Sequence, residues 1–102
     1  MRVEDKIQDI FDIDTQFSIV GDSLVANVEV SFDNIIRVIF ETSYLHNRIY
    51  KYSTNEVRFV FSWCDKNWQE YLIKVKELDT GVSIHITQAT RYKVEGGVII
   101  NE

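Results

Sequence analysis

The stretch VRFVFSWCDKNWQEYLIKV, residues 57–75, decides the fold of this 102-residue chain. Apolar and polar residues alternate on both sides of its centre, which is the period of a β-strand with one buried face. A hairpin that sets Phe61 opposite Tyr71 gathers the apolar residues of both arms on one face. In the same register Phe59 lies opposite Ile73. The pattern therefore predicts an antiparallel β-hairpin with one well-determined register.

Turn chemistry supports this register, and the hairpin has a second apolar face. Cys64 falls opposite Trp68, and the three-residue loop between them ends at Asn67. Such loops need a left-handed residue at their last position, which asparagine tolerates. On the second face, Val60 and Leu72 lie together with Cys64 and Trp68. We expect a helix to cover this face; the alternative is an exposed apolar patch that binds a partner, with Trp68 as a contact residue.

The N-terminal third combines a helix with a hairpin. Residues 2–12 fit a helix, because apolar residues recur there at helical spacing: Val3, Ile7, Ile10 and Phe11. Phe17–Val20 and Ser23–Phe32 then flank a tight turn, in which Gly21 supplies the positive φ that such turns require.

Residues 33–49 fit two structures. Heptad spacing links five of them: Ile35, Val38, Thr42, Leu45 and Ile49. In that reading Asp33 is the N-cap, Asn47 stops the helix, and the second helix covers about 34–47. A strand would instead turn three residues inward: Ile36, Val38 and Phe40. The sustained spacing favours the helix; the strand would give a mostly β meander or a small barrel.

The C-terminal half is predicted to be strands. Asp79-Thr80-Gly81 marks a turn, after which Val82–Thr87 alternates between apolar and polar residues. We expect this strand to run on through Ala89–Val94 as one long strand with a bulge, and Gly96-Gly97 to close a last hairpin. Isoleucine and valine together number 25, against 6 leucines and alanines, which favours strands overall. The expected fold is one β-dominated α+β domain over residues 1–102.

The chain lacks the residue patterns of common catalytic and metal sites. Cys64 is the single cysteine, so neither an internal disulfide nor a cysteine-based zinc site can form. His46 and His85 are far apart, and the pair Asp12 and Asp14 is more typical of solvated acids at a helix end than of a cation site. No nucleotide-binding, hydrolase or metalloprotease motif is present. We therefore expect no enzyme activity, no cofactor and no metal.

Negative charge is concentrated at the start of the chain. Residues 1–33 hold eight acids and two bases, a balance of −6, whereas residues 34–102 hold eight acids and nine bases, a balance of +1. Such a surface attracts basic partners and repels phosphate backbones. The sequence therefore indicates a small acidic cytoplasmic protein that binds other proteins or inhibits one of them. Its candidate contact residues are Asp5, Asp9, Asp12, Asp14 and Trp68.

Two alternatives use other segments. In Tyr44–Tyr52 basic and aromatic side chains interleave, which is typical of a surface that binds a ligand or single-stranded nucleic acid. The net charge of −5 disfavours nucleic acid. Val98–Asn101 could form an edge strand that pairs with a second copy in a homodimer. No apolar run reaches the ~20 residues of a membrane span, so we expect no membrane contact.

Overall fold

The computed structural model describes residues 2–42, 47–64, 68–88, 92–95 and 98–101. Its elements follow in this order: α1 (Val3–Phe11), β1 (Ser18–Val20), β2 (Ser23–Val28), α2 (Phe32–Thr42), β3 (Asn47–Tyr52), β4 (Glu56–Cys64), β5 (Trp68–Leu78), β6 (Gly81–Gln88), β7 (Tyr92–Glu95) and β8 (Val98–Asn101). The result is the expected α+β fold dominated by antiparallel strands.

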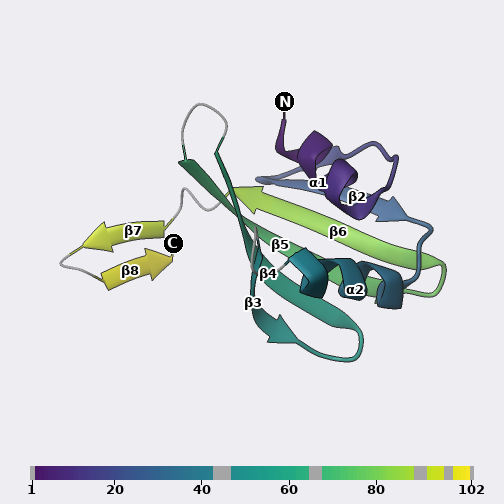
Figure 1. The fold of residues 1–102 in the computed structure, drawn as a ribbon. Coiled ribbons are helices and arrows are strands. Elements are labelled where there is room, and N and C mark those ends of the chain that lie inside the picture. Colours follow the sequence, from purple (N-terminus) through teal and green to yellow (C-terminus); the bar gives the residue numbers. More distant parts are fainter. Residues whose placement is uncertain (1, 43–46, 65–67, 89–91, 96–97, 102) are drawn as a thin grey trace.

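The main sheet has six strands in the order β1-β2-β6-β5-β4-β3, and it does not close into a barrel. Both helices pack on one of its faces, here called the inner face (Figure 1). The opposite side is called the outer face. β7 and β8 form a separate two-stranded sheet.

The central hairpin has the predicted register. Phe61 pairs with Tyr71 and Phe59 with Ile73. The backbone of Cys64 also pairs with that of Trp68, as the three-residue loop requires. The loop and the side chain of Trp68 lie outside the described residues.

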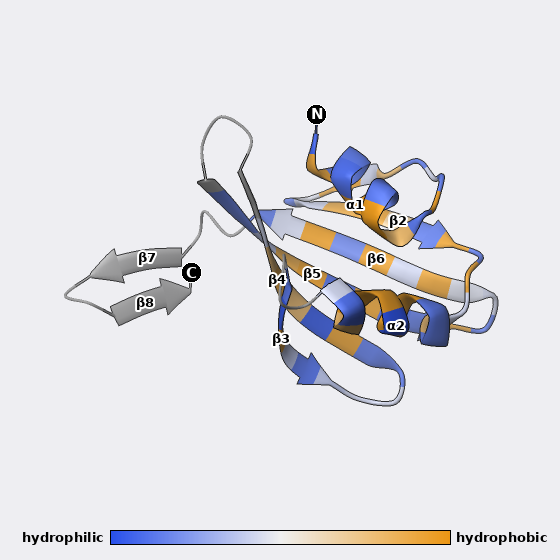
Figure 2. Cartoon of the chain, in the orientation of Figure 1, coloured by the Kyte–Doolittle hydropathy of each residue, from blue (hydrophilic) through white to orange (hydrophobic). Residues whose placement is uncertain are grey.

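The core lies between the inner face and the helices. Apolar and polar residues alternate along β5 and β6, as Figure 2 shows, so that alternate side chains enter the core. The ring of Phe11 packs edge-on against Phe59, with 6.3 Å between centroids. Burying one such large apolar side chain stabilises a fold by about 1.5–3 kcal/mol. The buried core residues are Val3, Ile7, Phe11, Phe32, Ile35, Ile36, Ile39, Val57, Phe59, Phe61, Ile73, Val75, Val82, Ile84 and Ile86.

The ambiguous segment contains a helix followed by a strand. α2 begins one residue before Asp33, and the Ser31 hydroxyl caps it by accepting a hydrogen bond from the Asn34 backbone N–H at 3.1 Å. The Thr42 hydroxyl ends the helix by donating back to a carbonyl of the preceding turn at 2.9 Å. Asn47, predicted to be the helix stop, is the buried first residue of β3, and its amide donates to the Thr42 hydroxyl at 2.6 Å. The predicted helix was therefore too long, because its heptad pattern ran on into a strand.

Two strand predictions also need correction. β2 ends at Val28, and Phe32 belongs to α2, where it joins the buried helical stripe. β6 ends at Gln88, and β7 lies in a different sheet from β6. Residues 82–94 are therefore not one long strand. The final hairpin is as expected, with Glu95 paired to Val98.

Candidate functional site

Among the acidic residues proposed as contacts in α1 and the turn after it, Asp5 has a structural role, whereas the other three are exposed. The Arg2 backbone N–H donates to the Asp5 carboxylate at 3.3 Å, and the Arg2 guanidinium lies 3.6 Å from the same oxygen. Asp5 thus stabilises the start of the helix, where negative charge is favourable. Asp9, Asp12 and Asp14 are exposed, and none forms an ion pair with a described residue.

Hydrogen bonds hold the exit from α1 in place. Asp12 adopts a left-handed conformation with φ of 53°, which aspartate tolerates better than most residues. The Ile13 backbone N–H donates to the Gln8 carbonyl at 3.0 Å, and the Thr15 backbone N–H donates to the Gln8 side chain at 2.8 Å. This turn holds Asp12 and Asp14 on the surface at the helix C-terminus, where negative charge is unfavourable for the helix.

A second group of acidic residues lies at the end of the sheet where strands β2 and β5 end. The β2–α2 and β5–β6 connections line an open hollow of about 370 Å³. Four carboxylates contribute to its lining: Glu29, Asp33, Glu77 and Asp79. Among the described residues no group of three potential metal ligands converges, so the hollow is an acidic surface without a metal-binding arrangement. No local sequence pattern marks this hollow, because the two connections become neighbours only once β2 and β5 flank β6.

The alternative binding segment is in part an edge strand. Tyr50 and Tyr52 on β3 are 56% and 55% exposed, and Tyr52 packs edge-on against Phe40 of α2 with 5.5 Å between ring centroids. Arg48 pairs with Glu70 on β5 at 2.8 Å. Residues 44–46 lie outside the described residues. The described part therefore offers exposed aromatic rings, but both of its cations, Arg48 and Lys51, already have a carboxylate partner.

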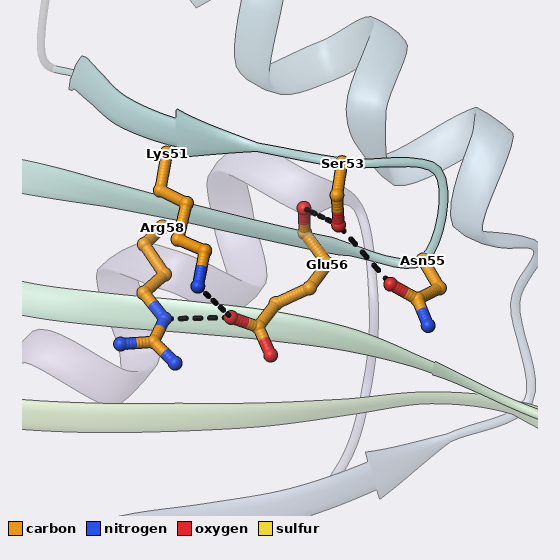
Figure 3. A network of polar contacts seen from close by, with 5 residues as sticks. All are labelled: Lys51, Ser53, Asn55, Glu56 and Arg58. Carbon is orange, nitrogen blue, oxygen red and sulfur yellow. Dashed lines mark hydrogen bonds and ion pairs between the residues drawn. The ribbon is translucent and has the colours of Figure 1, made fainter.

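The outer face carries a polar network around Glu56. Its carboxylate accepts a hydrogen bond from Arg58 Nε at 2.6 Å and lies 3.9 Å from Lys51 Nζ (Figure 3). These contacts lower the pKa of Glu56, the Arg58 hydrogen bond most of all. The adjacent turn is closed by the Ser53 backbone N–H, which donates to the Glu56 carbonyl at 2.8 Å.

The outer face is not covered as expected. Val60 and Leu72 pair across β4 and β5 on this face and are half-buried, but both helices pack on the inner face. The expectation that a helix covers them is therefore wrong for the described part of the chain. The described helices both bury their apolar residues against the inner face, so neither of them covers the other side.

No protein-family model matches the chain, and no curated protein or solved structure is significantly similar to it. None of the described helices is long and apolar enough to cross a membrane.

Proposed function

We propose that this chain is a non-catalytic protein-interaction module of the cytoplasm, of the kind that binds or inhibits a basic partner protein. The observation that supports this most directly is the acidic exit of α1. Asp9, Asp12 and Asp14 are exposed and have no ion-pair partner among the described residues, and hydrogen bonds hold the backbone at the turn. We call these three residues the acidic exit.

Electrostatic attraction supplies the mechanism. Three unpaired carboxylates close together in the sequence attract a cationic surface and raise the rate of encounter, an effect that salt screens. Exposed charges contribute little to folding, and negative charges at a helix C-terminus oppose it. Asp5 is left out of the contact surface because Arg2 already engages it. Trp68 stays a predicted contact residue.

The test replaces the acidic exit with neutral residues of the same shape. Asp9→Asn, Asp12→Asn and Asp14→Asn are combined in one variant, since asparagine also tolerates the left-handed conformation at position 12. A matched control removes three exposed charges elsewhere, with Glu29→Gln, Glu41→Gln and Glu77→Gln. Stopped-flow association with a labelled octalysine peptide is measured at low and high salt. A pull-down from native extract compares the same variants.

We expect the acidic-exit variant to associate more slowly than wild type and to show a flatter salt dependence, with the control close to wild type. Its melting temperature should be nearly unchanged. Association at the wild-type rate at low salt would show that the acidic exit is only a solvated helix end.

A second candidate function uses β3. Exposed Tyr50 and Tyr52 flank Lys51, which is an arrangement that can stack bases or hold a ligand. Tyr50→Ala with Tyr52→Ala should then abolish binding of single-stranded oligothymidylate, measured by fluorescence anisotropy. Self-pairing of β8 in a homodimer is a separate proposal. Analytical ultracentrifugation tests it, and a monomer at all concentrations would exclude it.

A further inference from the structure

Four basic side chains form one row across the outer face. Lys51 on β3 lies opposite Arg58 on β4, and Arg58 lies opposite Lys74 on β5. Lys74 in turn lies opposite His85 on β6. We call these four residues the basic row. Only the register between four strands brings them together, so no local sequence pattern reveals the row.

The row sets like charges opposite each other on neighbouring strands. Like charges directly opposite each other on neighbouring strands are destabilising. Glu56 compensates one end of the row by binding Arg58 and Lys51. Lys74 and its strand neighbour Lys76 form no ion pair with a described residue.

Charge on the outer face is positive as a whole. The described residues of this face carry five cationic side chains and two carboxylates: Arg48, Lys51, Arg58, Lys74 and Lys76 against Glu56 and Glu70. The pKa of His85 is lowered, first by burial and then by the positive charge of Lys74. Neutral residues fill neighbouring outer-face positions, such as Val25 opposite His85 and Thr87 opposite Leu72, so strand pairing does not require the charges.

Glu56 shows which chemical group the row accepts. Its carboxylate binds a guanidinium and approaches an ammonium group on the outer face. Four strands span about 14 Å at their usual spacing. An extended peptide covers that distance with about four or five residues.

We infer that the basic row, together with Lys76, is a binding surface for an acidic segment of a partner protein. The segment's carboxylates pair with Lys74 and Lys76 and extend the pattern that Glu56 begins. This surface lies on the opposite side of the sheet from α1. The inference is therefore independent of the proposed role of the acidic exit, and either can fail alone.

The experiment measures binding of a labelled, capped hexaglutamate peptide by fluorescence anisotropy at low ionic strength. Hexathymidylate serves as the competing probe. The test variant combines Lys74→Gln with Lys76→Gln. The matched control combines Lys6→Gln with Arg37→Gln, which removes the same charge from the helical side. Urea denaturation shows that each variant folds.

We expect hexaglutamate to bind wild type and the test variant to weaken binding roughly three- to thirtyfold, as the loss of two exposed ion pairs predicts. The control should change it by less than about twofold, since its charges lie across the sheet. No binding by wild type, or an equal loss in both variants, would overturn the inference. Tighter binding of hexathymidylate than of hexaglutamate would also overturn it and assign the face to nucleic acid.

Discussion

Replacing Gly81 by alanine should be among the most damaging single changes in this protein. Gly81 opens β6 and lines the acidic hollow, with φ of +153°, a conformation that residues with a side chain rarely adopt. An added Cβ would overlap the backbone carbonyl oxygen of Val28 and lie only 2.9 Å from the Glu29 Cα. Ordinary carbon–carbon contacts are about 3.5–4.0 Å. The neighbouring backbone must therefore move, and no flexible side chain is available to yield.

Two contributions set the magnitude. Backbone strain of this kind costs about 1–3 kcal/mol, and overpacking against rigid neighbours costs about 1–3 kcal/mol. We therefore expect Gly81→Ala to lower the free energy of unfolding by about 2–6 kcal/mol. In a domain of this size that corresponds to a fall in melting temperature of at least about 10 °C.

Gly21→Ala is the matched control. Gly21 also has a positive φ, +61°, but nothing lies within 4 Å of the position of an added Cβ. It should cost only about 1 kcal/mol, the usual penalty for a left-handed alanine. Urea denaturation followed by tryptophan fluorescence measures both variants. Equal losses for the two, or a loss below about 0.5 kcal/mol for Gly81→Ala, would refute the reasoning.

Three further predictions concern single side chains. Phe59→Ala should lower the free energy of unfolding by about 3–5 kcal/mol, because the ring is fully buried; a loss under 1 kcal/mol in urea denaturation would contradict its place in the core. Carboxyl NMR should find the pKa of Glu56 below its ordinary value, and Arg58→Gln should raise it. Because the pKa of Glu56 is depressed in the folded protein, Glu56 stabilises the fold above its ordinary pKa. This stabilisation is lost as the pH falls through the pKa of the folded state. Glu56→Gln should remove this pH dependence from the free energy of unfolding. Imidazole NMR should find the pKa of His85 lowered, and Lys74→Gln should restore it only in part, since burial is the larger cause; full restoration would contradict this order.

Local patterns predicted the elements whose period and turn chemistry agree. The register that sets Phe61 opposite Tyr71 followed from alternation and loop length alone, and so did the tight turn at Gly21. Patterns that continue across the boundary between two elements gave wrong predictions. The heptad spacing of α2 carries on past Thr42 into β3, where the buried Asn47 occupies a strand position.

The surface was less predictable than the fold, because it depends on which strands are neighbours. Acidity at the exit of α1 is visible in the sequence, since Asp9, Asp12 and Asp14 are close together there. Lys51 and His85, by contrast, are 34 residues apart in the sequence and join one row only through three strand pairings. No local pattern contains that information.

The two sides of the sheet give the molecule a permanent electric dipole. Its acidic helix packs on one side, and its basic row lies on the other. A net charge of −5 therefore describes poorly how the protein meets a charged surface. It should arrive at a cationic surface with α1 in front, and at an anionic surface with the sheet in front. Each kind of surface would select its own orientation before any specific contact forms.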